Sequence, residues 1–279
     1  MSWNLDQIPV VCLNLDRRPD RWERVQNSAG FKSFPHIERW SGTDGKELDI
    51  QNDPRISVLV KHNVIRHTRR GHEYINTAGA VGCYLSHASA YEWFAKSNHP
   101  AVLIFEDDID LPAGCYERLK EYIAKTPLLQ DSSKWDMWQL GANISEGSPV
   151  SSSDPTVDVK AFVLAHAYFV SQRGVKRLLE QIYPLELHVD GYMSYLAKID
   201  RLKIYASPNY MFYQAGSASD IFPGHMCPLC DIPDDFDKHS ALVPKSDLRK
   251  IMLADNGLKM FGALATAYAL YRVYKLTRK

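Results

Sequence analysis

The sequence predicts an α/β protein with a mixed β-sheet flanked by helices. Apolar runs in Ile8–Leu15 and Ala101–Phe105 are typical of strands buried on both faces of a sheet. Segments with helical spacing lie between these runs, and charged residues follow each run directly. Because ligands of open α/β sheets bind just beyond the carboxyl ends of strands, these charged residues predict the position of the functional site.

Length and composition exclude several other classes of protein. The 279 residues suffice for a substantial core, and 33 lysines and arginines balance 33 aspartates and glutamates, which excludes a general basic field for nucleic acid. Five cysteines, an odd and mostly scattered set, indicate a reducing compartment. The sequence shows neither a leader nor a run of roughly 18–20 uncharged apolar residues, so we expect a cytoplasmic protein.

The first strand is expected at Ile8–Leu15, followed by a polar turn and a helix with Pro19 in its first turn. A strand, a turn and a helix N-terminus in this order often bind phosphate in α/β proteins. Arg17, Arg18 and Arg21 supply guanidinium groups that suit phosphate geometry. A surface turn with Arg–Asp pairs remains the alternative, and neither the GxGxxG nor the GxxxxGK[ST] pattern is present.

A second strand is expected at His36–Ser41, and the glycine-containing stretch from Gly42 to Gly45 then predicts a tight turn. The end of this strand should lie beside the first strand, where residues 40–44 can face a bound base or ribose. Residues 46–76 are polar and weakly periodic, which favours a solvated loop.

The next helix should begin after Thr77, which can cap its first turn. Gly79 and Gly82 permit close approach of another backbone or of a ligand. Ser86 and His87 follow one helical turn after Gly82. A lone helical histidine is more often a structural residue than a ligand, so both roles stay open for His87.

Four carboxylates directly follow the most apolar strand, at Glu106, Asp107, Asp108 and Asp110. Carboxylates packed this closely repel one another unless a cation lies among them, and Mg²⁺ or Mn²⁺ prefers carboxylate oxygens. We expect Asp108 and Asp110 to project to the same side of an extended segment. A metal-dependent site for a nucleotide or phosphate ester is therefore favoured over a solvated acidic turn.

The remaining elements are less strongly marked. Further strands are expected at Trp135–Gly141, Lys160–Val170 and Leu202–Ala206, and helices over 171–181 and 191–198. The Ser-, Pro- and Gly-rich segment Ser145–Pro155 predicts a flexible surface loop.

Three segments taken together resemble glycosyltransferase family 25, the lipopolysaccharide-type and collagen galactosyltransferase-like enzymes. These segments are VVCLNLDRRPDRWE, GAVGCYLSH and VLIFEDD, and the pieces His166–Ser171, Asp190 and Gln214–Ile221 fit the same pattern. The resemblance implies a GT-A-type, Rossmann-like fold, a UDP-sugar donor, Mn²⁺ or Mg²⁺, and inversion at the sugar carbon. The chain departs from the family in having His166-Ala167 before Tyr168, and it is short, which leaves the acceptor open.

The resemblance also assigns roles to residues. It implies metal contacts from Asp108 and Asp110, and Asp220 is either a further metal contact or a rival base. An inverting transfer needs a base for the attacking hydroxyl, and Asp190 is the candidate, with helix capping as the alternative role. Donor contacts are expected from Leu13, Asn14, Arg17, Arg21, Trp40, Gly42, Asp44, Gly79, Gly82, Ser86, His87, Glu106, Asp107, Asp108, Gln214 and Ser219.

The C-terminal part suggests a separate extension. We place the transferase domain at residues 1–240 and a helical extension at residues 241–279, which packs on the domain, on a second subunit as a homodimer, or peripherally on a membrane surface. His225, Cys227 and Cys230 offer three zinc ligands without a matching second pair, so plain loop thiols are the favoured reading.

The sequence therefore predicts an inverting, metal-dependent glycosyltransferase. It would move galactose, or next glucose or xylose, from a UDP-sugar to a hydroxyl of a glycan, a glycolipid or a protein. A non-catalytic nucleotide-sugar-binding protein and a metal-dependent phosphoesterase are the alternatives; the phosphoesterase lacks an evident nucleophile.

Overall fold

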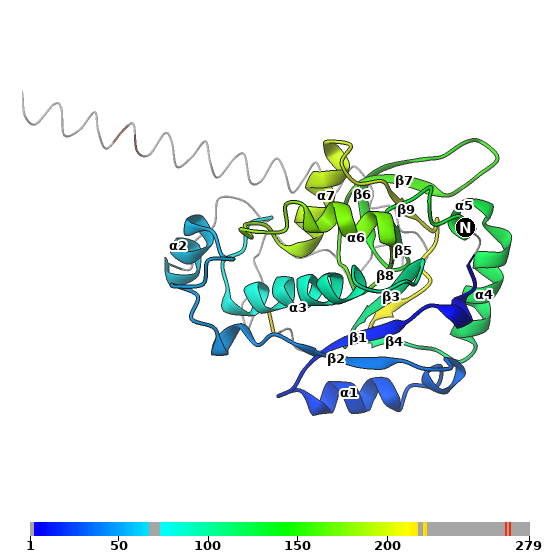
Figure 1. The fold of residues 1–279 in the computed structure, drawn as a ribbon, viewed down its shortest axis with the longest axis horizontal. Helices are drawn as coiled ribbons and strands as arrows, with labels where there is room; N and C mark the ends of the chain where they lie inside the picture. Colours follow the sequence, from blue (N-terminus) through cyan, green and yellow to red (C-terminus); the bar gives the residue numbers. More distant parts are fainter. Residues whose placement is uncertain (1–2, 67–72, 217–219, 222–265, 267, 269–279) are drawn as a thin grey trace, which may run out of the picture.

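The computed structural model describes residues 3–66, 73–216, 220–221, 266 and 268. Within these residues the fold is an eight-stranded mixed sheet with helices on both faces (Figure 1). The strand order is β2-β1-β3-β8-β5-β9-β7-β6, and β8 and β7 run opposite to the other strands. The predicted α/β class with a mixed sheet is confirmed.

The elements follow in chain order. The sheet strands are β1 (Val10–Leu15), β2 (Glu38–Gly42), β3 (Ala101–Glu106), β5 (Met137–Gln139), β6 (Asn143–Pro149), β7 (Val157–Val163), β8 (Ala167–Ser171) and β9 (Ile204–Ala206). A separate two-stranded ribbon pairs β4 (Ile109–Asp110) with β10 (Tyr213–Gln214). The α-helices are α1 (Pro19–Gln26), α2 (Val58–Arg66), α3 (Ala78–Phe94), α4 (Cys115–Lys125), α5 (Pro127–Gln130), α6 (Gln172–Leu179) and α7 (Val189–Lys198).

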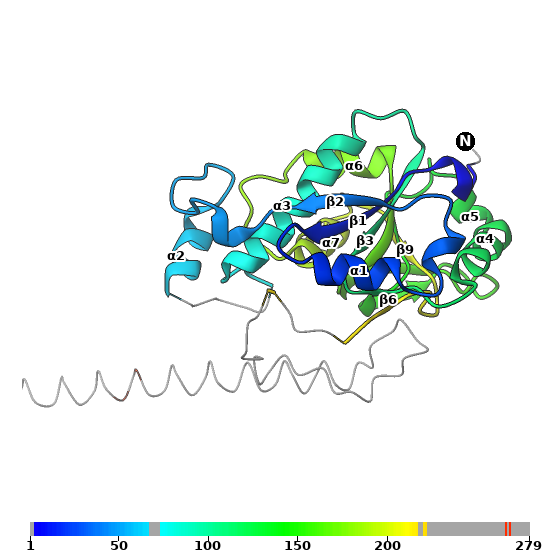
Figure 2. The ribbon, with the colours of Figure 1, turned by 90° about the horizontal axis from the view of Figure 1, so that it is seen from below.

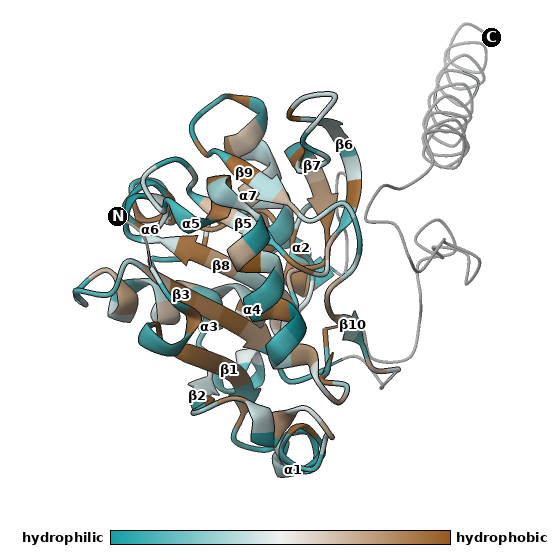
Figure 3. Cartoon of the chain, turned by 90° about the vertical axis from the view of Figure 1, so that its right-hand side faces the viewer, coloured by the Kyte–Doolittle hydropathy of each residue, from teal (hydrophilic) through white to brown (hydrophobic). Residues whose placement is uncertain are grey.

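The central strands β1 and β3 are buried on both faces, as their unbroken apolar sequences predict. Val102 and Ile104 of β3 face one core, whereas Leu103 and Phe105 face the other. Figure 3 shows both strands in the brown of apolar residues. Side chains alternate between the faces of a strand, so a continuous apolar run is what two covered faces require.

Different helices cover the two faces of the sheet. Apolar residues of α3, α6 and α7 belong to one core, and those of α1 and α4 belong to the other. In Figure 2, α4 lies at the right-hand end of the molecule and α3 lies nearer its centre. The helix α3 carries eleven buried residues along 17 positions, because β2, α6 and α7 all pack against it.

The expected strand Lys160–Val170 is in fact two strands. The chain breaks at Leu164, whose φ of 75° lies in the left-handed region, and β7 and β8 then occupy different places in the sheet. Continuous apolar sequence hid this break, because both strands and their connection contain buried residues.

The prediction of a loop over Ser145–Pro155 is wrong for its first half, since β6 continues to Pro149. This strand lies at the edge of the sheet and pairs only with β7 within the described sheet. Polar, exposed residues are compatible with such an edge position. The weakly periodic stretch 46–76 also contains an unpredicted helix, α2.

Several predictions concern residues outside those that the structure describes. They include the 241–279 extension apart from residues 266 and 268, the zinc candidates His225, Cys227 and Cys230, and the donor contact Ser219. Across the described part of the chain, every helix is too short or too polar to traverse a lipid bilayer.

The turn after β2 packs unusually closely against α3. A Cβ atom added at Gly82 would lie 2.4 Å from the Thr43 carbonyl oxygen, and one added at Gly45 would lie 1.7 Å from the Ala78 carbonyl oxygen. Ser86 fixes the same contact, because its hydroxyl accepts a 2.8 Å hydrogen bond from the Thr43 backbone N–H. Close backbone approach thus explains the glycines in both segments.

We expect the Gly82→Ala variant to be less stable by about 2 kcal/mol, the middle of the range for overpacking a tight site. Alanine gains about 1 kcal/mol of helix propensity over glycine. The clash outweighs this gain because a backbone carbonyl cannot rotate away. Urea unfolding followed by tryptophan fluorescence measures the difference. Gly216→Ala is the control, since its Cβ would meet no described atom within 4 Å, and equal losses in the two variants would contradict the argument.

Candidate functional site

A cavity of about 1220 Å³ opens at the carboxyl ends of β1 and β3. Its walls come from the β1–α1 turn, the turn after β2, the first half of α3, the acidic residues after β3, the β7–β8 connection and one face of α7. The 214–216 and 220–221 segments complete its lining. The site thus lies where ligands of α/β sheets bind.

Most predicted site residues line this cavity. The lining includes Leu13, Asn14, Arg17, Arg21, Gly42, Asp44, Gly79, Ser86, His87, Glu106, Asp107, Asp108, Asp190, Gln214 and Asp220. Among the predicted residues that the structure describes, three do not line it, namely Trp40, Gly82 and Asp110.

Each of the three residues outside the lining has another structural position. The Trp40 indole donates a 2.9 Å hydrogen bond to the Ser89 hydroxyl and packs against Trp93, on the side of β2 that faces α3. Gly82 contacts the backbone of the 43–45 turn rather than open space. Asp110 is exposed on β4, opposite Tyr213.

The chain turns at Asp107 and Asp108 before β4 begins, so the segment from Asp108 to Asp110 is not uniformly extended. For this reason Asp108 belongs to the cavity lining and Asp110 does not. The expectation that the two carboxylates project together rested on an extended backbone, and the turn at Asp107 and Asp108 departs from that premise.

Asp107 is neutralised by partners from the first strand and helix. Its carboxylate accepts hydrogen bonds from Arg21 at 2.8 Å and from the Asn14 side-chain amide at 2.7 Å. Its backbone carbonyl accepts a further bond from Arg24. The β1–α1 region therefore fixes the acidic turn in place.

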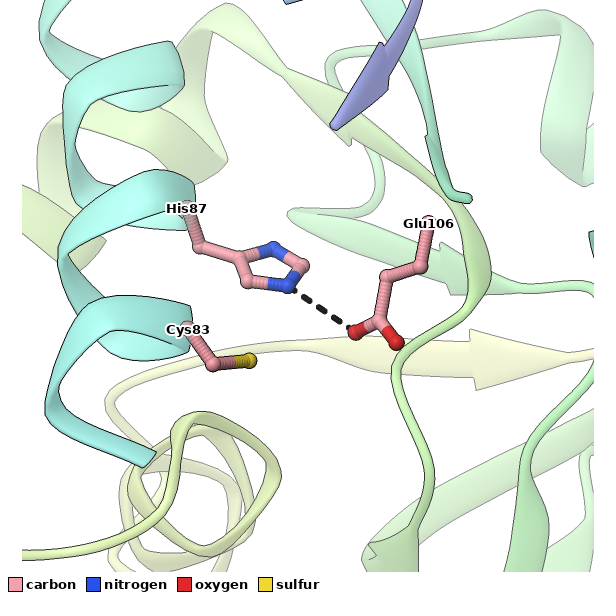
Figure 4. Close-up of side chains that lie close together, drawn as sticks. All are labelled: Cys83, His87 and Glu106. Carbon is pink, nitrogen blue, oxygen red and sulfur yellow. Dashed lines mark hydrogen bonds and ion pairs between the residues drawn. The ribbon is translucent and has the colours of Figure 1, made fainter. Parts of the chain in front are cut away.

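Glu106 faces α3 and pairs with His87, as Figure 4 shows. The His87 Nε2 atom lies 3.0 Å from Glu106 Oε1, and its Nδ1 atom lies 2.6 Å from the hydroxyl of the buried Tyr168. That hydroxyl lies 2.6 Å from the Tyr91 hydroxyl. Burial raises the pKa of Glu106, but the hydrogen bond and attraction from His87 outweigh it and bring the pKa below its ordinary value.

Asp108 differs from its two neighbours in lacking a cationic contact in the described structure. One of its oxygens accepts a 3.0 Å hydrogen bond from Gln214, and the other is buried without a hydrogen-bond partner among the described residues. Burial, followed by the charges of Glu106 and Asp107, raises the pKa of Asp108 to about 7. A cation beside this carboxylate would relieve the cost of its charge.

Arginines of the β1–α1 turn bind the distant Asp220. Arg17 donates a 2.8 Å hydrogen bond to this carboxylate, and Arg18 also pairs with it. Arg17 contacts Asp44 as well, at the turn after β2. Although burial raises the pKa of Asp220, the arginines lower it below its ordinary value. The arginines that were expected to contact phosphate therefore also form the Arg–Asp pairs of the alternative interpretation.

Asp190 lies in the first turn of α7, on the opposite wall from the β1–α1 turn. Its carboxylate accepts the backbone N–H of Leu164 at 3.0 Å and that of Gly191 at 2.8 Å. The residue at the N-cap position is His188. Asp190 therefore anchors the β7–β8 connection while its side chain remains part of the cavity lining.

The sequence left several lining residues unpredicted, including Cys83, Ser194, Tyr195 and Lys198. Helical spacing is the signal that identifies them. Cys83 precedes His87 by four positions, and Ser194 and Lys198 follow Asp190 by four and eight. By contrast, nothing in the sequence places the 161–165 connection in the cavity, because that depends on the break at Leu164.

The fold and the site define a class, namely α/β proteins with an acid-lined cleft at the ends of parallel strands. Comparison with protein-family models gives a match over residues 7–193 to glycosyltransferase family 25, described as LPS biosynthesis protein. The chain belongs to this family. The match contains β1, α3, β3 and the first turn of α7.

Individual relatives are similar in sequence over much of this region. A glycosyltransferase 25 family member of Aedes aegypti is 27% identical over 66% of this chain and 30% of its own length. Procollagen galactosyltransferase 1-A of Xenopus laevis is 25% identical over 61% of this chain and 28% of its own length. The inactive glycosyltransferase 25 family member 3 of Mus musculus is 28% identical, with the same 61% and 28% coverage. The aligned regions thus span about three-tenths of these relatives.

The raised pKa of Asp108 predicts a pH-dependent stability. Between about pH 4 and pH 7 the folded protein retains a proton on Asp108 that the unfolded chain has lost, so a rising pH favours unfolding. Asp108→Asn removes this contribution. With chelator present, the stability of the variant relative to the native chain should rise by about 4 kcal/mol across this range, since each pH unit over which the proton difference persists contributes about 1.4 kcal/mol.

Urea unfolding of both proteins at several pH values measures this difference. A difference that stays constant with pH would contradict the assigned titration. Asp200→Asn is the control, because this exposed carboxylate pairs with Lys160 at the surface, away from the acidic turn.

Proposed function

We propose that this protein is an inverting, metal-dependent glycosyltransferase that uses a UDP-sugar donor, with galactose as the first candidate sugar and glucose or xylose next. The observation that carries the proposal is the buried, partly unpartnered Asp108 in a cavity that Asp190 also lines. Membership of glycosyltransferase family 25 supports sugar transfer in general. The name of one relative as a procollagen galactosyltransferase supports galactose.

The residues at the end of β3 fit a hard divalent cation. Asp108 offers one oxygen without a partner among the described residues, and its elevated pKa reflects burial first and then the negative charge of Glu106 and Asp107, which a cation would offset. Oxygen ligands of this kind suit Mn²⁺ or Mg²⁺. When bound, such an ion would neutralise the charge of the leaving diphosphate.

The side of the cavity that the β1–α1 turn forms fits the nucleotide. Arg17 and Arg21 line it beside the N-terminus of α1, where guanidinium groups and backbone N–H groups favour phosphate. The turn at Gly42–Asp44 forms the adjoining wall. The volume of about 1220 Å³ exceeds the roughly 300–1,000 Å³ of common small-molecule sites, so a sugar nucleotide and part of an acceptor can share it.

Asp190 is positioned to act as the base. In the proposed step the acceptor hydroxyl oxygen attacks the anomeric carbon, its proton passes to the Asp190 carboxylate, and UDP departs on the opposite side. The hydrogen bonds from Leu164 and Gly191 fix the orientation of the carboxylate, and each oxygen retains a second lone pair for the proton. The acceptor would be a glycan, a glycolipid or a protein hydroxyl.

The first test is a donor panel of UDP-galactose, UDP-glucose, UDP-xylose and UDP-N-acetylhexosamines, with Mn²⁺ or with chelator. We expect one sugar to show metal-dependent release of UDP, because the acidic turn requires a cation for diphosphate binding. Asp108→Asn should lower this turnover at least about 100-fold, as loss of a buried electrostatic contact to the reacting group does.

Asp110→Asn is the matched control, because Asp110 lies on β4 outside the cavity lining and should retain most of the activity. Binding of a UDP-sugar without turnover would favour the nucleotide-sugar-binding alternative, and one relative in this family is itself named inactive. Absence of binding to every donor under every condition would reject the donor site.

The second test concerns the base. Asp190→Asn should lower kcat by about 10²–10⁴-fold, the usual contribution of a general base, while the donor Kd changes little. The donor Kd is measured by calorimetry and kcat by transfer to the acceptor. Ser194→Ala, one helical turn further on the same wall, is the control. A loss confined to donor affinity would contradict the role of Asp190 as base.

A further inference from the structure

The cavity contains a second group of potential ligand atoms that the proposed transfer does not use. One ligand atom each of Cys83, His87 and Glu106 lies within 4.8 Å of the other two. Figure 4 shows the thiol, the imidazole and the carboxylate converging between α3 and the end of β3. All three residues belong to the cavity lining, so an ion can reach them.

The spacing of these atoms suits a small tetrahedral ion. Bonds of about 2.0–2.3 Å to nitrogen, oxygen and sulfur give ligand-to-ligand separations of roughly 3.3–3.8 Å. His87 Nε2 and Glu106 Oε1 lie 3.0 Å apart, slightly closer than this range, and the upper limit of 4.8 Å is slightly wider. Small side-chain rotations would bring all three atoms to bonding distance and leave a fourth position open toward the cavity.

Surrounding residues support His87 as a ligand. A ligating histidine usually donates its other ring N–H to a fixed acceptor. His87 Nδ1 lies 2.6 Å from the Tyr168 hydroxyl, which in turn lies 2.6 Å from the Tyr91 hydroxyl. With an ion on Nε2, the Nδ1–H group donates to the Tyr168 hydroxyl and the Tyr168 O–H donates to the Tyr91 hydroxyl, so the hydrogens of the histidine and of Tyr168 both have acceptors.

We propose that Cys83, His87 and Glu106 form a binding site for a borderline-soft divalent ion of the Zn²⁺ class. The thiolate selects such an ion, whereas the oxygens of the neighbouring Asp107 and Asp108 prefer Mg²⁺ or Mn²⁺. The two kinds of ion would therefore bind different walls of one cavity. This proposal does not depend on the proposed transfer reaction.

The test uses Co²⁺ as a spectroscopic substitute for Zn²⁺, with the full chain carrying Cys227→Ser and Cys230→Ser to remove the other cysteine pair. We expect one equivalent of Co²⁺ to give a near-ultraviolet thiolate charge-transfer band that Zn²⁺ abolishes by displacement. Cys83→Ser should eliminate the band and weaken Zn²⁺ binding at least tenfold in competition titrations. Cys115→Ser, which removes a buried thiol on α4, should leave both unchanged.

A second variant addresses the hydrogen-bonded chain behind the site. Tyr168→Phe should retain the band and lower Zn²⁺ affinity about tenfold, as loss of an outer partner of a metal ligand does. A band that persists in Cys83→Ser, or the absence of any band in the parent protein, would overturn the proposal. Both readouts are independent of UDP-sugar turnover.

Discussion

The structure depends on how it accommodates three consecutive carboxylates at the end of one buried strand. The charges of Glu106, Asp107 and Asp108 are accommodated in different ways. Glu106 pairs with His87 of α3, and Asp107 pairs with Arg21 of α1. Asp108 retains an elevated pKa. Two of the carboxylates thus connect the sheet to a helix on each side, and the third is left to a ligand.

This division of partners explains why the cavity is built from distant parts of the chain. Helix α3 supplies the histidine that hydrogen-bonds Glu106 and must approach closely, which requires glycine at its contact with the 43–45 turn. Helix α1 supplies arginine, and its first turn follows β1 directly. Because β1 and β3 are neighbouring strands, the histidine contact and the arginine contact of these carboxylates lie at the same edge of the sheet.

Local sequence patterns predicted the central strands, the position of the site and the start of α1. The apolar runs of β1 and β3 and the charges that follow them determine where the site lies, and Pro19 marks the first turn of α1. The sequence could not show that a turn at Asp107–Asp108 separates Asp110 from the cavity, because turn geometry depends on pairing with β10. It also could not reveal the interruption between β7 and β8 at Leu164, because the backbone N–H there donates a hydrogen bond to the Asp190 carboxylate, 26 positions away.

The pairing of Asp220 with Arg17 and Arg18 has a consequence for biosynthesis. These partners are 203 and 202 positions apart. At about 5–20 residues per second, a ribosome adds Asp220 roughly 10–40 s after the arginines. The nascent chain can therefore assemble β1, α3 and β3 while the arginines of the β1–α1 turn still lack Asp220. During that interval a chaperone or an anionic metabolite can bind these arginines without competition from the Asp220 carboxylate.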